Sequence, residues 1–330
     1  MNNLKNMKTR LLCAIVLVAS TWSFAAVAQE TAVEVLRSGI PHDSLYAIDM
    51  TDDRGLAVGN YGLMLETQNG GESWELSAPE TKLALFAIAT SGENQIVVGQ
   101  SGTVLTRVGD GDWVTVESGF TQRLLSVAMN TSGITVAVGE FGFIGLSDDA
   151  GNSWRSTVVD WEAFNEEGYE PHLYDAVVEE DGSILIVGEF GLVLPSTDGG
   201  KSFSGVVTGD QSLFDIHMAE DGTSVGYVVG QEGFVGKTMD NGHTWQTVEV
   251  PSSSNLLGVW SGHGEVVITG IRTMLRSSDD GQSFTGSDDV QIVRTWYQGI
   301  DSGVSGADGS FAEQNVYVVG HEGSIARVTQ

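Results

Sequence analysis

The sequence predicts an all-β fold: one seven-bladed β-propeller with four-stranded blades, closed by an N-terminal strand that completes the last blade. Three observations predict it: a recurring glycine phrase, a second turn motif that follows it, and an incomplete unit at each end. The glycine phrase is a short apolar run, Val-Gly or Thr-Gly, two variable residues and usually a second Gly. Its repeats lie roughly 40 to 50 residues apart, the period of a four-stranded blade. The anchoring glycines are Gly59, Gly99, Gly139, Gly188, Gly230, Gly270 and Gly320.

Each repeat opens with two bulky residues and continues with the alternation of apolar and polar residues that is typical of a strand. A second strand ends in the glycine phrase, whose turn leads into a third strand. Glycine suits this turn because it adopts backbone angles that a Cβ penalises. The opening pairs are Leu45-Tyr46, Leu85-Phe86, Leu124-Leu125, Leu173-Tyr174, Leu213-Phe214, Leu256-Leu257 and Trp296-Tyr297.

The third strand leads into the second motif, Ser/Thr-x-Asp-x-Gly-x-Ser/Thr-Trp/Phe, which runs for example from Ser147 to Trp154. We expect the Asp oxygens to accept N–H groups within the turn and the aromatic ring to pack between blades. An outer strand follows the aromatic residue. Further copies begin at Ser196, Thr238, Ser277 and, with Asn in place of Asp, Thr67, whereas the second repeat keeps only Trp113.

The ends of the chain predict how the ring closes. The seventh unit stops at Gln330 after its third strand, and residues 32–36 have the pattern of an outer strand. Their pairing would remove sheet edges that promote aggregation. Strand direction places the blade-to-blade connections and the glycine-phrase turns on one face, here called the connection face. The Asp-containing turns lie on the opposite face, here called the box face.

Residues 1–28 have the pattern of a secretory signal peptide, which leaves residues 29–330 as the propeller. Three basic residues precede an apolar run, and small residues end at Ala28, where cleavage is expected. The single cysteine, Cys13, lies in this segment, so the mature chain has no thiol. Export without disulfides predicts a periplasmic protein that does not insert into the membrane after cleavage.

Charge and residue spacing narrow the classes of partner and cofactor. The net charge is −29, and the loss of the three signal-peptide cations takes it to about −32. Such a surface repels nucleic acid and anionic lipid. The six histidines show no metal-ligand spacing, and the pairs Asp148-Asp149 and Asp279-Asp280 fall in the Asp-containing turns. The sequence therefore predicts no cofactor, metal or catalytic residue.

Two long segments interrupt the repeat, and loops on rigid scaffolds often carry function. Residues 160–172, aromatic and acidic, join blades three and four on the connection face, whereas residues 301–313 form a loop rich in Gly, Ser and Asp on the box face. Exposed aromatic residues are enriched at interfaces, although those of the first segment could instead cover a small core of their own. The predicted partner-contact residues are Trp161, Phe164, Tyr169, His172, Phe141, Phe190, Trp296 and Tyr297, with Arg272 and Arg294 as charge anchors.

The Asp-containing turns resemble the repeats of bacterial sialidases and related glycosidases. That resemblance implies three arginines around a substrate carboxylate, for which Arg123, Arg272 and Arg294 are the candidates. The Phe/Tyr-Arg-Ile-Pro start of that family is absent and no Tyr–Glu pair stands out, so we predict that the chain is not an enzyme. A ligand-binding module that uses the central funnel is a third hypothesis.

The units as a whole resemble the propeller family of photosystem II stability and assembly factors. Residues 69–74 and 198–203, with the phrase Asn/Asp-Gly-Gly-x-Ser-Trp/Phe, carry the resemblance most closely. It implies a non-catalytic scaffold that binds and assists a membrane protein complex. That complex is a photosystem in photosynthetic organisms and, in other bacteria, a transporter of the resistance-nodulation-division (RND) type. The acidity of this chain departs from the arginine-rich patch of the photosynthetic members.

Overall fold

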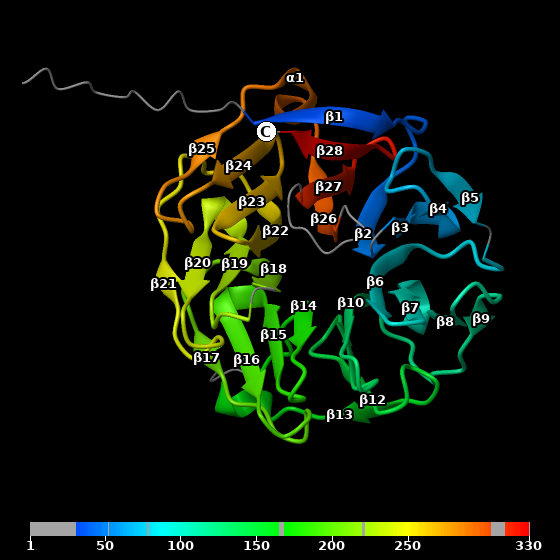
Figure 1. Cartoon of the computed structure of the whole chain (residues 1–330). Coiled ribbons are helices and arrows are strands. Elements are labelled where there is room, and N and C mark those ends of the chain that lie inside the picture. The colour runs from blue at the N-terminus through cyan, green and yellow to red at the C-terminus, as the bar shows by residue number, and fades with distance from the viewer. Residues whose placement is uncertain are drawn as a thin grey trace, which may run out of the picture.

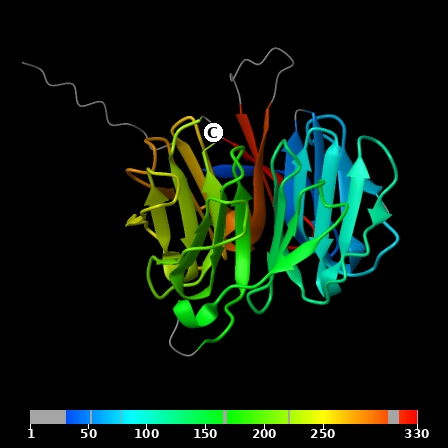
Figure 2. The same ribbon diagram turned by 90° about the horizontal axis from the view of Figure 1, so that it is seen from below.

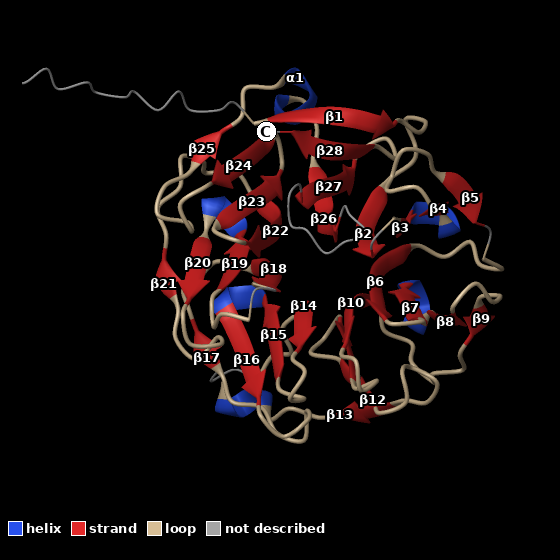
Figure 3. Ribbon diagram, in the orientation of Figure 1, coloured by secondary structure: helices blue, strands red, loops and turns tan. Residues whose placement is uncertain are grey.

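The chain forms seven four-stranded antiparallel sheets arranged as blades around a central channel, which confirms the predicted propeller (Figure 1). Strands dominate, and the remaining elements are single helical turns (Figure 3). The structure is a computed structural model that describes residues 31–51, 53–77, 79–164, 168–219, 222–304 and 314–329. The predicted signal peptide and most of the box-face insertion, residues 305–313, lie outside these ranges.

The first four blades follow one another in the chain, each built from the inside outward. Blade 1 comprises β2 (Leu45–Thr51), β3 (Arg54–Gly59), η1 (Asn60–Gly62), β4 (Met64–Thr67) and β5 (Glu75–Ser77). Blade 2 comprises β6 (Leu85–Ser91), β7 (Asn94–Gly99), η2 (Gln100–Gly102), β8 (Val104–Val108) and β9 (Val114–Thr115). Blade 3 comprises β10 (Leu124–Met129), β11 (Thr135–Gly139), β12 (Ile144–Ser147) and β13 (Arg155–Thr157), followed by η3 (Trp161–Ala163). Blade 4 comprises β14 (Leu173–Val178), β15 (Ile184–Gly188), η4 (Glu189–Gly191), β16 (Leu192–Ser196) and β17 (Val206–Val207).

The last three blades complete the ring. Blade 5 comprises β18 (Leu213–Met218), β19 (Gly226–Gly230), η5 (Gln231–Gly233), β20 (Val235–Thr238) and β21 (Gln246–Thr247). Blade 6 comprises β22 (Leu256–Gly262), β23 (Glu265–Gly270), β24 (Thr273–Ser277) and β25 (Thr285–Gly286), followed by α1 (Val290–Val293). Blade 7 comprises β26 (Tyr297–Val304), β27 (Gln314–Gly320) and β28 (Ile325–Thr329), with β1 (Ala32–Arg37) as its outer strand.

The N-terminal strand closes the ring as predicted. β1 pairs antiparallel with β28, with Ala32 opposite Thr329 and Val35 opposite Ala326. Arg327 of β28 forms a 2.6 Å ion pair with Glu34 of β1. The two ends of the chain therefore share one sheet, and the outer edge of β28 is covered (Figure 1).

The anchoring glycine of each phrase is required by close packing and not by its backbone angles. Gly59 has φ −163°, an extended conformation that any residue adopts. A Cβ at Gly59 would lie 1.9 Å from the carbonyl oxygen of Ser44. The other six anchoring glycines meet the carbonyl before their own inner strand in the same way. The turn itself uses the second glycine of the phrase, as expected, since Gly62 has the left-handed φ of 72° and follows Tyr61 at φ 55°.

Backbone hydrogen bonds confirm that the blade-to-blade connections and the glycine-phrase turns share one face. The N–H of Gly102 donates to the carbonyl of Gln122 at 2.7 Å, and that of Gly142 donates to Pro171 at 2.8 Å. Figure 2 shows this connection face at the bottom of the view, where η3 lies, and the β26–β27 end of blade 7 at the opposite, box face.

The Asp-containing turns have the predicted geometry. Ser147 Oγ accepts the N–H of Gly151 at 2.9 Å and donates to Asp149 Oδ1 at 2.8 Å. Asp149 accepts the backbone N–H and the hydroxyl of Ser153, and these hydrogen bonds lower the pKa of its carboxyl. The same turn hydrogen bonds lower the pKa to about 2 at Asp198, Asp240 and Asp279.

The core lies between the blades. Each aromatic residue that ends a turn motif packs against a cluster drawn from its own blade and the preceding one. Trp74 contacts the cluster of blades 7 and 1 that contains Tyr317 and Leu45, and Phe203 contacts the cluster of blades 3 and 4. The apolar surface is therefore buried between the facing sheets of neighbouring blades, and not in a single central core.

Candidate partner-binding surface

Seven residues with left-handed backbones stand at the tips of the connection face, one for each blade. They occupy the second position after the anchoring glycine, and all have φ between 55° and 59°. A residue other than Gly, Asn or Asp is disfavoured there because its Cβ crowds the backbone. The seven are Tyr61, Ser101, Phe141, Phe190, Glu232, Arg272 and Glu322. Three are aromatic and exposed: Tyr61 (76%), Phe141 (62%) and Phe190 (48%).

The residue before each tip fixes the turn to the start of the inner strand. Asn60 Oδ1 accepts the N–H of Ser44, and Gln100 Oε1 accepts that of Ala84. In blades 3 and 4 a carboxylate takes the place of the amide. Glu140 accepts the N–H of Arg123, and Glu189 accepts that of His172 at 2.8 Å. A neutral side-chain amide therefore holds this turn in blades 1 and 2, and a carboxylate holds it in blades 3 and 4.

The accessible aromatic residues of the first insertion gather with the tips of blades 3 and 4. The ring centres of Tyr169 and Phe190 are 5.0 Å apart, and those of Phe141 and His172 are 5.1 Å apart, both edge to face. His172 also contacts Tyr174 of β14 at 6.4 Å. Tyr169 is 39% exposed. We call the set Phe141, Tyr169, His172, Phe190 and Glu189 the blade 3–4 surface.

Two predicted contact residues of the insertion belong instead to the core. Trp161 is 7% exposed, and its ring covers the turn at Gly142, where a Cβ would come within 2.5 Å of it. Phe164 packs beside Trp161, with ring centres 6.0 Å apart, and against Gly205. These two rings therefore fasten the insertion to blades 3 and 4, as the alternative explanation held. Residues 165–167 lie outside the described ranges.

The remaining predicted contact residues lie across the ring, at blades 6 and 7. Trp296 is half-buried and stacks on Tyr46 of blade 1, with ring centres 6.4 Å apart. Tyr297 is 2% exposed and belongs to the core. Arg272 is the exposed tip of blade 6, and Arg294 is exposed just after α1. The structure therefore does not place this group with the blade 3–4 surface.

The three arginines of the glycosidase hypothesis come from different blades. Arg123 pairs with Glu140 at 3.3 Å, and its guanidinium lies 5.9 Å from the ring centre of Phe86. Arg272 and Arg294 form no ion pair with any residue that the structure describes. No contact among the described residues joins the three into one anion-binding set.

A β-bulge falls at the second residue of every inner strand. The channel mouth holds a cavity of about 150 Å³. Its lining includes the residue at this position of every blade: Tyr46, Phe86, Leu125, Tyr174, Phe214, Leu257 and Gln298. Gln298 occupies the blade 7 position because Tyr297 pairs with Gly320 as Leu45 pairs with Gly59. The predicted opening pair Trp296-Tyr297 was therefore wrong by one residue.

Two carboxyl groups face each other just inside this mouth. Asp175 accepts the hydroxyl of Ser126 at 2.6 Å and the N–H of Ile216 at 3.0 Å, and Asp215 accepts the N–H of Val259 at 2.6 Å. Desolvation raises the pKa of both carboxyls, and the charge of Asp175 raises that of Asp215 further. A pair of this kind holds one shared proton.

Sequence reasoning missed the Asp175–Asp215 pair, although a signal was present. Both residues occupy the third position of an inner strand, where the other blades carry Ala, Ser or Gly. Two positions further along β18, desolvation lowers the pKa of His217 to about 4, and its Nδ1 lies 3.2 Å from Ser261 Oγ. These hydrogen bonds fasten the inner strands of blades 3 to 6 to one another.

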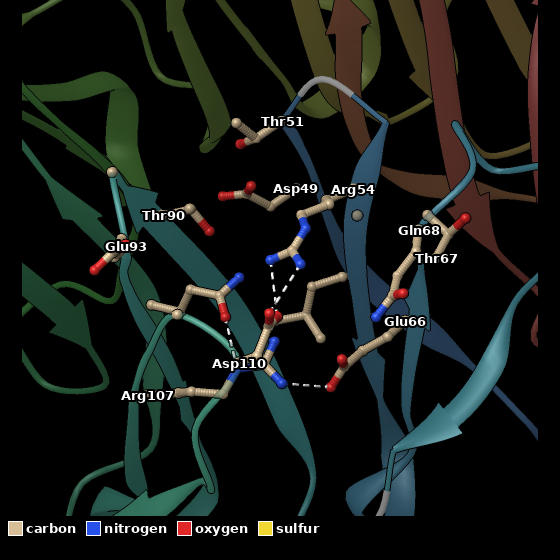
Figure 4. A pocket seen from close by; sticks show the side chains of 15 residues that line it. Asp49, Thr51, Arg54, Glu66, Thr67, Gln68, Thr90, Glu93, Arg107 and Asp110 are labelled. Carbon is tan, nitrogen blue, oxygen red and sulfur yellow. Dashed lines mark hydrogen bonds and ion pairs between the residues drawn. The ribbon is translucent and has the colours of Figure 1, made fainter.

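A charged groove of about 240 Å³ lies between blades 1 and 2 on the box face (Figure 4). Arg54 pairs with Asp110 at 2.8 Å, and Arg107 pairs with Glu66 at 2.8 Å. The Arg107 guanidinium also lies 4.5 Å from the ring centre of Trp113. These charges join blade 2, which lacks the Asp-containing turn, to blade 1.

Two features are absent from the described ranges. No group of three or more His, Cys, Asp or Glu side chains could hold a metal ion there. None of the helices there is long and apolar enough to cross a membrane.

Comparison with known proteins gives a family match over part of the chain and a fold shared over nearly all of it. Residues 27–161 match the family model described as photosynthesis system II assembly factor YCF48. A structure titled "YCF48 bound to D1 peptide" is 17% identical with a TM-score of 0.70, covering 92% of this chain and 97% of that one. YCF48 from Cyanidioschyzon merolae is 18% identical with a TM-score of 0.68, covering 91% and 98%.

A glycosidase shares the fold more distantly in sequence. The GH74 xyloglucanase from Xanthomonas campestris is 14% identical with a TM-score of 0.68, covering 90% of this chain and 53% of that one. No curated protein matches the sequence. Residues 27–161 thus resemble the photosystem II assembly factor propellers, and the solved structures show that the fold is shared over the rest of the chain.

Proposed function

We propose that this protein is a periplasmic, non-enzymatic scaffold that holds a segment of a membrane protein complex on its connection face. The observation that carries the proposal is the blade 3–4 surface, where Phe141 and Phe190 are exposed although their left-handed backbone disfavours an aromatic residue. Strained and exposed apolar residues persist where the surrounding structure and a function retain them.

The resemblance to the YCF48 assembly factors supports a membrane protein complex as the class of partner. A YCF48 structure contains a D1 peptide, so a propeller of this family holds a peptide segment. We propose an RND-type transporter as the partner of this chain, in keeping with its predicted export and its acidity.

A pull-down from detergent-solubilised membranes tests the proposal. The chain, expressed with its own leader and a C-terminal tag, is compared with the double variant Phe141→Asn, Phe190→Asn. Ser101→Asn, Glu232→Asn changes the same turn position in blades 2 and 5 and is the matched control. We expect the wild type and the control to recover a membrane protein that the aromatic variant loses. Failure of the wild type to recover any, or equal recovery by all three, would contradict the proposal.

The glycosidase alternative is tested with the same preparations. Hydrolysis of a sialoside or of xyloglucan by the wild type, lost in Arg272→Ala, would replace the scaffold proposal. We expect no turnover, because the contacts of the described residues do not bring Arg123, Arg272 and Arg294 together.

A further inference from the structure

The negative charge of Glu189 exceeds what the fold requires at its position. Its carboxylate accepts the N–H of His172 and lies 3.4 Å from the hydroxyl of Tyr174. Gln100 performs the equivalent backbone contact in blade 2 with a neutral amide. A carboxylate is therefore not needed to hold the turn, and its charge is available for another purpose.

That charge has no counter-ion among the described residues. Glu140, the corresponding acid of blade 3, is paired with Arg123, whereas Glu189 forms no ion pair in the described part of the chain. The Nδ1 atom of the nearest histidine, His172, is occupied by the N–H of Phe141. Burial, and next the charge of Glu189, raise the pKa of the Tyr174 hydroxyl to about 12, so this neighbour stays neutral.

The aromatic residues beside Glu189 offer the complementary half of a cation site. Phe190 follows Glu189 directly, and Tyr169 lies edge to face with Phe190 at 5.0 Å. Aromatic faces attract ammonium and guanidinium groups. Elsewhere on this face the guanidinium of Arg123 already lies over the ring of Phe86 at 5.9 Å, next to a carboxylate. The blade 3–4 surface also places aromatic rings beside a carboxylate, and no described Lys or Arg pairs with that carboxylate.

We propose that the blade 3–4 surface binds a Lys or Arg side chain that is flanked by apolar residues in the bound segment of the partner. The proposal rests on the proposed function and specifies the chemistry of the partner. Apolar neighbours of the cation would cover Phe141 and Phe190, while the cation pairs with Glu189. The acidity of the whole chain would speed the approach of such a segment.

Fluorescence anisotropy with two labelled synthetic peptides tests this inference. One peptide alternates Lys-Phe pairs with Gly-Ser, and the other carries Gln in place of each Lys. Glu189→Gln keeps the backbone contact, as Gln100 does, and Glu93→Gln removes one exposed acid from the box face as the matched control.

We expect the wild type and Glu93→Gln to bind the Lys peptide alike, with the Gln peptide weaker. Glu189→Gln should weaken the Lys peptide by roughly two- to fivefold, leave the Gln peptide unchanged and flatten the salt dependence. Equal weakening by both substitutions, equal affinity for both peptides, or no binding of either would overturn the inference. A membrane protein that the pull-down recovers equally with Glu189→Gln would keep the proposed function and refute only its charge preference.

Discussion

The backbone N–H of Phe141 donates a 3.1 Å hydrogen bond to Nδ1 of His172, and the two rings meet edge to face. The bond joins the tip of blade 3 to the residue that precedes the inner strand of blade 4. Because Trp161 packs beneath the same turn, the exposed ring of Phe141 is presented from a fixed backbone. A preorganised aromatic side chain loses little entropy on binding, which suits a docking surface.

Replacing Phe141 by Asn should stabilise the protein and weaken partner binding. Asn adopts the left-handed conformation at lower cost than Phe, so we expect the free energy of unfolding to rise by about 0.5–1 kcal/mol. Chemical denaturation measures the gain, with Ser101→Asn as a control that should gain stability without loss of binding. A lower stability of Phe141→Asn would show that the ring serves the fold.

Replacing Asp215 by Asn should stabilise the protein at pH 8 and have little effect near pH 4. The folded-state pKa of Asp215 lies above its value in the unfolded chain, so the folded state binds more protons and loses stability as pH rises through this range. An amide accepts the N–H of Val259 and donates to Asp175 without a shared proton. We expect a rise in Tm of roughly 2–4 °C at pH 8, measured by calorimetry. A Tm difference that does not depend on pH would contradict the shared-proton interpretation.

Replacing His217 by Asn should reduce the loss of stability in acid. The folded-state pKa of about 4 lies below the unfolded value, so the unfolded state binds more protons between about pH 4 and 6.5. Wild-type stability from this group is therefore present above that window and lost as pH falls through it. Unfolding curves between pH 7 and 4 should slope less steeply for His217→Asn than for the wild type. Parallel curves would mean that His217 has the same pKa in the folded and the unfolded chain.

Replacing Ser147 by Ala should destabilise blade 3. The buried hydroxyl accepts the N–H of Gly151, and its removal leaves that donor unsatisfied inside the turn. We expect a loss of about 1–3 kcal/mol in the free energy of unfolding, measured by urea denaturation. Ser156→Ala, in the neighbouring outer strand and exposed, is the control that should leave the midpoint unchanged.

The repeat pattern was sufficient to predict the ring. Apolar alternation, the glycine phrase and the Asp-containing turn are local signals, and each recurs often enough to set the number of blades. The pattern also predicted that residues 32–36 close the ring. The seventh unit lacks an outer strand, and this N-terminal strand belongs to no other unit, so the two were expected to pair. The physical reason is that the blades form from contacts between neighbours in the chain.

The site was predicted only in part, because the burial of a side chain depends on which other segments of the folded chain pack against it. Phe141, Tyr169, His172 and Phe190 come together, whereas Trp161 and Tyr297 are covered by other elements. Nothing in the sequence near Trp161 shows that its ring lies on Gly142, a residue in the turn of the preceding blade.

The sequence by itself determined the seven blades, their two turn types and the face on which each insertion lies, because these follow from periodicity and strand direction. Only the tertiary structure decided which aromatic residues are exposed, that Asp175 and Asp215 face each other, and that Glu189 forms no ion pair with a described residue. Those properties arise between neighbouring blades, where side chains far apart in the sequence compete for the same space and the same hydrogen-bond donors.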